Sequence, residues 1–398
     1  MKIHRLGWRF FPVILLGLSA WLGNSIRTWP QTSRATGVPL ATEDRLKNPG
    51  WWPTKGTPPR NEYAGADACA KCHGSKFATQ RITPMARAAA KPADAEVLRT
   101  HNRLTFRLDG YSYEIARTEN GSVYSVSDGT SSISQPLSWA LGVGEVGQTY
   151  IFEKNETFYE SRVSFYPAAE GLLDLTLGHQ PPLPNQLENA PGRAISTSEA
   201  RLCFGCHTTA STTGNQFDVR HLFPGVGCEA CHGPGAKHVA AMQGGHIEQG
   251  KRLTLNPARL KPVDSVDFCG ACHRTSWDVV LGGLTGIANV RFQPYRLEKS
   301  RCWGKGDARI TCIACHDPHL PLVRDAAAYD KQCFRCHLVK TTIKPALKAT
   351  QTRPGAPCPV SANKCVTCHM PKYELPGFHA KFTDHWIRIA RPNAPYPD

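Results

Sequence analysis

The chain has 398 residues, of which 41% are hydrophobic and 20% are charged, so its composition excludes a wholly disordered protein. Its 34 glycines and 31 prolines predict many turns and few long helices. The formal charge of +15 would suit a nucleic-acid partner, but the pattern of the 16 cysteines indicates another origin for it.

The first 25 residues have the pattern of an export segment. Lys2, Arg5 and Arg9 form a basic region, and residues 10–22 form an apolar stretch of signal-peptide length. This stretch is shorter than the about 20 residues that a membrane-spanning helix needs, and no second apolar span follows it. We therefore expect either cleavage after Ser25 or an uncleaved N-terminal anchor. In both cases the protein is predicted to be periplasmic, and any membrane attachment is through this segment alone.

Two regions after the export segment, residues 26–64 and 101–180, contain no cysteine. Residues 26–64 are rich in proline, tryptophan and threonine, which predicts an extended linker. Residues 101–180 alternate apolar and polar side chains, which predicts a small antiparallel β insert. Its turns are expected at Asp109-Gly110, Asn120-Gly121, Asp128-Gly129 and Lys154-Asn155. We interpret the insert as a structural platform, with gating of a substrate as the alternative.

A pattern of Cys, two other residues, Cys and His occurs seven times and leaves only two of the 16 cysteines outside it. We number the copies motif 1 to motif 7 in chain order. They are Cys69, Cys72, His73; Cys203, Cys206, His207; Cys228, Cys231, His232; Cys269, Cys272, His273; Cys312, Cys315, His316; Cys333, Cys336, His337; and Cys365, Cys368, His369.

This spacing is the attachment signature of c-type haem. Two thiols separated by two residues can both form thioethers with one haem, and the next histidine becomes the proximal ligand of its iron. Structural zinc needs four-ligand sets, thioredoxin-like chemistry needs one motif, and a disulfide framework does not repeat one spacing with a histidine. The sequence therefore predicts seven covalently bound haem c groups. Their propionates would balance the basic polypeptide, so we expect no nucleic-acid partner.

Motifs 2 to 7 lie within residues 203–369, which is too little chain per motif to build an ordinary apolar core. We therefore expect the fold of a multihaem cytochrome c, in which short helices and coil are wrapped around a haem core beside the β insert. The predicted boundaries are 65–100 for a first haem segment and 181–398 for a six-haem domain.

Histidines outside the motifs are candidates for distal haem ligands. His238 follows motif 3 after a tight Gly-Pro turn, and His319 lies three residues past His316, so His319 would reach a neighbouring iron. Met85 is a candidate thioether ligand for motif 1. A set of haems in which most irons have two histidine ligands would have low reduction potentials. The remaining candidates are His379 and His385 near the C-terminus, and His221, His246, His179 and His101.

Cys302 and Cys358 lie outside the motifs. In an oxidising compartment two remaining cysteines most simply form a disulfide with each other. The alternative is a thiolate ligand on one iron or a reactive thiol.

Four strings in the chain carry a resemblance to a known group of proteins: YAGADACAKCH, GVGCEACHGPGAKH, SRCWGKGDARITCIACHDPH, and CPVSANKCVTCHMPK followed by FHAKFTDHWIRI. They resemble bacterial multihaem cytochromes c of the superfamily that includes nitrite reductase and hydroxylamine oxidoreductase. They look most like its exported doubled-CxxCH cytochromes. The resemblance implies bis-histidine haems in parallel and perpendicular pairs, and it favours His238, His319, His379 and His385 as ligands. It also implies a distal histidine roughly where this chain has Met85.

These observations favour an exported heptahaem electron carrier with no catalytic residue. Its expected partners are other redox proteins, such as a quinol-oxidising membrane complex or a cytochrome. One alternative is a reductase or oxidase of small nitrogen or sulfur compounds at one open haem, with motif 1, flanked by Met85, Arg81 and Arg87, as its site. The resembling nitrite reductases use a CxxCK motif, which this chain lacks. The other alternative is a subunit of a larger redox complex.

Overall fold

The computed structural model describes residues 58–179, 184–214, 216–304, 306–337, 358–361, 363–391 and 394–397. The predicted export segment and the linker up to residue 57 lie outside these ranges. Within them, no helix combines the length and the hydropathy needed to cross a membrane.

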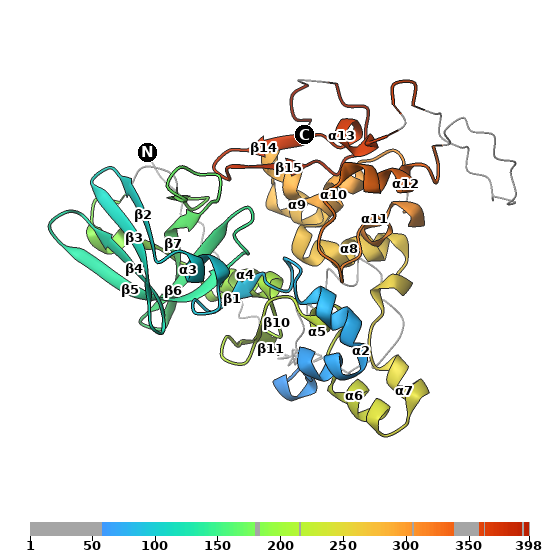
Figure 1. Cartoon of the computed structure of the whole chain (residues 1–398), viewed down its shortest axis with the longest axis horizontal. Coiled ribbons are helices and arrows are strands. Elements are labelled where there is room, and N and C mark those ends of the chain that lie inside the picture. The colour runs from blue at the N-terminus through green and yellow to red at the C-terminus, as the bar shows by residue number, and fades with distance from the viewer. Residues whose placement is uncertain are drawn as a thin grey trace, which may run out of the picture. The chain divides into compact units, whose positions relative to one another are not determined.

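The largest sheet of the described residues is antiparallel and has nine strands (Figure 1). Its main path runs β2-β3-β4-β5-β6-β7-β8, while β1 pairs with β5 and β9 pairs with β7. Strands β2 and β8, at the two ends of this path, also contact each other, so the sheet curls on itself. The strands are β1 (Ala89–Ala90), β2 (Arg103–Leu108), β3 (Tyr111–Thr118), β4 (Gly121–Ser127), β5 (Ser132–Leu141), β6 (Gln148–Lys154), β7 (Thr157–Phe165), β8 (Leu173–Leu175) and β9 (Gly192–Ala194).

The hairpin turns follow from residues that tolerate positive φ. Asp109 and Gly110 have φ of 45° and 86°, and they join β2 to β3 as the sequence predicts. At the β6–β7 turn the positive φ values fall on Asn155 and Glu156, one residue later than expected. Alternation along the strands places Tyr113, Tyr124, Phe152 and other apolar side chains in one buried core.

The sheet is larger than the small insert that the sequence predicts, because β1 and β9 lie outside residues 101–180. These strands have two and three residues, which is too short to show an alternating pattern. Gly192 explains the pairing of β9, since a Cβ at this position would lie 2.0 Å from the Glu160 carbonyl oxygen on β7. The glycine therefore permits a close approach that no periodicity reveals.

The motif-bearing part of the chain consists of short helices, two-stranded ribbons and coil, beside a sheet that is larger than the predicted insert. Its apolar clusters are small: one joins Leu260 and Phe268, and another joins Val266, Leu297 and Trp303. Such clusters bury far fewer side chains than the core of the sheet. The helices are α2 (Ala66–Gln80), α3 (Glu96–Thr100), α4 (Thr197–His207), α5 (Cys228–His232), α6 (Ala236–Gln243), α7 (Ile247–Arg252), α8 (Pro262–His273), α9 (Ser276–Gly282), α10 (Gln293–Glu298), α11 (Cys312–Cys315), α12 (Asp330–Cys333) and α13 (Cys365–His369).

Three two-stranded ribbons complete the regular structure of the described residues. The C-terminal ribbon carries two of the candidate histidines, His379 in its turn and His385 just after its second strand. The ribbons pair β10 (Thr208–Thr209) with β13 (Phe223–Pro224), β11 (Thr212–Thr213) with β12 (Gln216–Phe217), and β14 (Lys372–Leu375) with β15 (Ala380–Thr383).

Candidate haem-attachment sites

Each motif lies on or at the end of a short helix. Helices α4 and α8 end at the motif histidines His207 and His273, and α5 and α13 consist of a motif alone. A helical turn places residues three apart on one face, which brings the two thiols of a motif together. At His73 the backbone of α2 leaves helical geometry, with φ of −112° and ψ of 38°. Local structure thus presents two thiols and one imidazole at a helix end.

Thiols of different motifs meet in pairs. In three cases the helices of two motifs contact each other, and the first cysteine of one motif lies close to the first cysteine of the other. The pairs are Cys69 with Cys228, Cys269 with Cys312, and Cys333 with Cys365. The fold therefore joins motif 1 to motif 3, motif 4 to motif 5, and motif 6 to motif 7.

Further contacts connect these pairs to one another. The pKa of Cys269 is raised by its bond to Cys312, by burial and by nearby thiols that include Cys231 of motif 3. Burial and then the neighbouring Cys333 of motif 6 raise the pKa of Cys315 in motif 5 to about 11. The Cys206 thiol of motif 2 donates to the carbonyl of Ala271 inside motif 4, at 3.7 Å. The motifs thus form one connected series in the order 1, 3, 4, 5, 6, 7, with motif 2 beside motif 4.

Three motif histidines have another histidine ring opposite them. The ring centroids of His73 and His238 are 6.5 Å apart, and their planes differ by 21°. For His232 and His319 the values are 6.1 Å and 16°, and for His316 and His385 they are 6.4 Å and 48°. Two metal–nitrogen bonds of about 2 Å, with each nitrogen about 1 Å from its ring centre, would put axial imidazoles about 6 Å apart. These separations fit one iron between each pair.

Hydrogen bonds to carbonyls fix the tautomer of several of these histidines. A carbonyl oxygen can only accept, so the Nδ1 atom that contacts it carries the proton and Nε2 keeps its lone pair for a metal. The Nδ1···O distances are 2.8–3.0 Å. The pairs are His207 with Ala88, His232 with Leu255, His238 with Gly250, His369 with Arg388, and His385 with Thr383.

Burial disfavours the charged form of four histidines in this part of the chain. Desolvation lowers the pKa of His207, His273 and His316 below the ordinary value of histidine, and it lowers the pKa of His385 to about 4. Neutral imidazole is the form that binds a metal. Thiols in pairs, neutral imidazoles at ligand spacing and small apolar clusters around the motifs together fit haem c.

Other candidate histidines direct a ring nitrogen to a carboxylate. Nε2 of His179 contacts Glu160 at 3.2 Å, and Nε2 of His379 contacts Asp174 at 2.7 Å. His221 is exposed, with Nδ1 2.9 Å from Asp218. These three rings are placed by acidic side chains and not opposite a motif histidine.

Three further candidates lie in local structure. His246 precedes α7 and is exposed, and the Nδ1 atom of His101 is 2.9 Å from the Val97 carbonyl. Met85 lies in the turn after α2, where its carbonyl accepts from Val226. His238, and not Met85, is therefore the side chain found opposite His73.

Cys302 and Cys358, the cysteines of the predicted disulfide, are both free thiols in the structure. Burial is the main cause of the raised pKa of Cys302, and its neighbouring thiols are Cys336 and Cys333 of motif 6. Cys302 thus lies close to motif 6, and its pairing with Cys358 stays a prediction.

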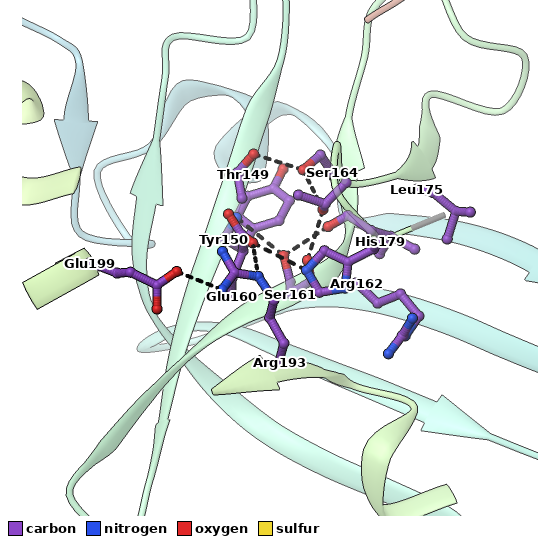
Figure 2. A network of polar contacts seen from close by, with 12 residues as sticks. Thr149, Tyr150, Glu160, Ser161, Arg162, Ser164, Leu175, His179, Arg193 and Glu199 are labelled. Carbon is purple, nitrogen blue, oxygen red and sulfur yellow. Dashed lines mark hydrogen bonds and ion pairs between the residues drawn. The ribbon is translucent and has the colours of Figure 1, made fainter. Parts of the chain in front are cut away.

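A polar network connects the sheet to the helix that carries motif 2 (Figure 2). Glu160 on β7 accepts from the buried His179 and, at 3.0 Å, from Arg193 on β9. Arg193 also donates at 2.9 Å to Glu199, which forms a capping box with Ser196 at the start of α4. Burial and then the nearby Glu160 raise the pKa of the Cys203 thiol to about 11. The network therefore positions motif 2 relative to β7 and β9.

Two acidic residues near the motifs were not expected from the sequence. Glu229, inside motif 3, accepts three backbone N–H groups of other segments. Asp330, three residues before Cys333, accepts the N–H groups of Lys364 and Cys365 at 2.6 and 2.8 Å. In the sequence, Glu229 is only a charged residue between two cysteines, which does not indicate that it accepts hydrogen bonds from backbone N–H groups. The acid ahead of Cys333 could have suggested a helix cap.

A family match in part of the chain points to the same chemistry. Residues 184–233, which contain motifs 2 and 3, match the family model of cytochrome c554 and c-prime. The solved structure of the outer cell wall cytochrome OcwA is similar with a TM-score of 0.45 and 15% identity, covering 82% of this chain and 80% of that chain. No curated protein matches. The family match and the repeated CxxCH pattern support a multihaem c-type cytochrome that binds haem c covalently and transfers electrons.

Proposed function

We propose that this chain is an exported heptahaem c-type cytochrome that carries electrons between redox proteins of the periplasm. The observation that supports this most directly is the packing of the motif helices on one another, with α2 on α5, α8 on α11, α12 on α13 and α4 on α8, and with Cys231 of motif 3 and Ala271 of motif 4 packed against the same apolar cluster. Electron transfer over a long distance requires a series of neighbouring haems, which haem-attachment motifs in contact would provide.

The chain's own residues have defined roles in this proposal. Haem c, when bound, supplies a one-electron iron couple at each motif. The two thiols of a motif fix the position of the group, and the motif histidine binds on the proximal side. Distal histidines oppose three of these, in the pairs His73 with His238, His232 with His319, and His316 with His385. At these three motifs an imidazole on each side would leave no place for a substrate, which favours a carrier over an enzyme there.

The pairing of thiols also determines which attached groups are neighbours. Because thioethers would hold each haem at its two cysteines, motifs whose helices pack on each other would hold neighbouring haems. Motifs 1 and 7 are at the two ends of the series. We propose that the donor, a quinol-oxidising membrane complex or another cytochrome, and the acceptor dock near these ends.

The alternative of an enzyme at motif 1 has less support than the carrier. It depended on Met85 as a weak axial ligand or on an iron without a sixth ligand. His238 occupies the position opposite His73, 6.5 Å away, and the Met85 segment contacts Val226 through its backbone. A role as a subunit of a larger complex is compatible with the same series of motifs.

The test is haem counting combined with low-temperature EPR of the oxidised holoprotein. We expect seven haems per chain, and we expect His319→Ala to convert one low-spin haem to high spin. His221→Ala is the matched control, because this exposed ring bonds to Asp218 and should leave every signal unchanged. Fewer than seven haems, or an unchanged spectrum in His319→Ala, would contradict the proposal.

A further inference from the structure

Glu229 is a buried carboxylate in an unusual place. It is the residue after the first cysteine of motif 3, on α5, and is 4% exposed. A buried carboxylate is costly unless hydrogen bonds compensate its charge. The three hydrogen bonds that Glu229 accepts therefore indicate the role of this residue in the fold.

All three bonds go to backbone N–H groups outside motif 3. Oε1 accepts from Ala64 at 2.8 Å and from Gly235 at 2.7 Å, and Oε2 accepts from Gly65 at 2.9 Å. Gly65 and Gly235 are the N-cap residues of α2 and α6, and neither helix has a side-chain cap of its own. Glu229 thus caps two helices from a third segment, where the helix dipole also favours a negative charge.

The two capped helices carry the two rings that face each other. Helix α2 carries His73, and α6 carries His238 three residues after Gly235. Their centroids are 6.5 Å apart, and the Cys69 and Cys228 thiols are in contact beside them. One carboxylate therefore holds the backbone on both sides of a single pair of imidazoles.

We propose that Glu229 is a positioning residue that sets the distance and orientation of His73 and His238 as axial ligands of the motif 1 haem. This inference rests on the proposed function, because it takes these two histidines as the axial pair. Only a carboxylate meets the requirement: three N–H donors need acceptors on both oxygens, and a glutamine would turn an NH₂ group toward one of them.

A second motif pair has the same device. Asp330 is 6% exposed, lies just before motif 6 and accepts two N–H groups at the start of α13, which is motif 7. Lys364, the N-cap of α13, has φ of 50° and no side-chain cap. The thiols of Cys333 and Cys365 are in contact here as well. In both pairs a carboxylate of one motif segment caps the helix of the motif with which it pairs.

The experiment compares Glu229→Gln with Glu248→Gln in the full-length holoprotein. The carboxylate of Glu248 is exposed on α7 and accepts a hydrogen bond from Lys251, so Glu248→Gln controls for loss of a charge. We expect Glu229→Gln to keep its full haem content while one low-spin EPR signal shifts its g values or becomes high spin. The midpoint potential of one haem should rise, because a negative charge has been removed near it. Glu248→Gln should match the wild type.

His238→Ala identifies the signal and separates the two proposals. The signal lost in His238→Ala should be the one altered in Glu229→Gln. If His238→Ala leaves every haem low spin, the ligand assignment of the proposed function fails, whatever Glu229 does. If His238→Ala removes a signal that Glu229→Gln leaves unchanged in g values and potential, the positioning role of Glu229 is overturned, even where stability falls.

If Glu229→Gln gives little holoprotein, Asp330→Asn provides a second test of the inference. Asp330→Asn should then alter a different signal from the one lost in His238→Ala. Added imidazole should restore low spin in whichever variant has become high spin, since the defect is placement of a ligand. If the EPR spectrum of Asp330→Asn is identical to that of the wild type, the inference that a buried carboxylate positions the ligands of paired motifs is overturned.

Discussion

The most severe loss of stability is expected at the buried ion pair of Arg296 and Asp384. Both side chains are 0% exposed, and Asp384 accepts from Nε and Nη2 of Arg296 at 2.9 Å each. Asp384 also accepts from Arg388 at 2.6 Å and from the Trp386 N–H at 3.0 Å. The guanidinium of Arg296 lies over the rings of Trp386 and Tyr396, at 5.0 and 4.5 Å from their centroids.

Asp384→Ala removes all four acceptor contacts and leaves the Arg296 charge buried without a carboxylate. Breaking one side of such a pair costs about 3–5 kcal/mol, a large fraction of the total stability of about 5–15 kcal/mol that proteins have. Arg309→Ala is the matched control, because it removes a bidentate pair with Asp307 that is partly exposed. We expect that variant to lose about 1 kcal/mol or less.

Guanidinium chloride unfolding of the holoprotein, followed by far-ultraviolet circular dichroism and Soret absorbance, measures both losses. The double variant Arg296→Met/Asp384→Leu should recover part of the stability lost in Asp384→Ala, because the fully buried Arg296 charge is removed while Arg388 still lacks its carboxylate partner. If Asp384→Ala loses no more than Arg309→Ala, the reasoning from burial is refuted.

Three other substitutions test the packing of the fold, each by chemical unfolding. Gly225→Ala should be far more destabilising than Gly110→Ala: both have positive φ (+74° and +86°), but only at Gly225 would a Cβ meet a carbonyl oxygen, that of Ala86, at 1.8 Å. Equal losses would show that backbone strain alone, about 1–2 kcal/mol, decides the outcome. Phe152→Ala, in the core of the sheet with its ring 5.2 Å from that of Tyr159, should cost about 3–5 kcal/mol, and a loss below about 1 kcal/mol would argue against that core. Ser196→Ala should cost about 1 kcal/mol by removing the cap of α4, unless a neighbouring acceptor replaces it.

Local patterns in the sequence predicted local structure well. Alternation and the Asp109-Gly110 turn indicated the strands of the sheet, and the CxxCH spacing indicated that two thiols and an imidazole lie together at each motif. Very short strands such as β9 escaped prediction, because its pairing depends on the absence of a Cβ at Gly192. Propensity contains no information about such a close approach between distant segments.

Ligand pairing was beyond the reach of the sequence for a similar reason. His238 and His379 are the same residue type beside similar turns, yet one faces His73 and the other contacts Asp174. Only the tertiary fold determines which histidine contacts a carboxylate and which histidine faces the ring of another histidine. The expectation that His319 reaches beyond its own motif could be made from spacing, but its partner, His232, could not be named.

The network of Glu160, Arg193 and Glu199 has a consequence for how the molecule opens. Helix α4 has only 11 residues, a length that is marginal in isolation. Its first turn is tied through Arg193 to β9, and β9 is a three-residue strand held by β7. Detachment of β9 would therefore remove a partner of Glu199 at the cap of α4, the helix that bears Cys203, Cys206 and His207. The outer strand and the motif helix should exchange their amide hydrogens as one cooperative unit, with protection that rises and falls together.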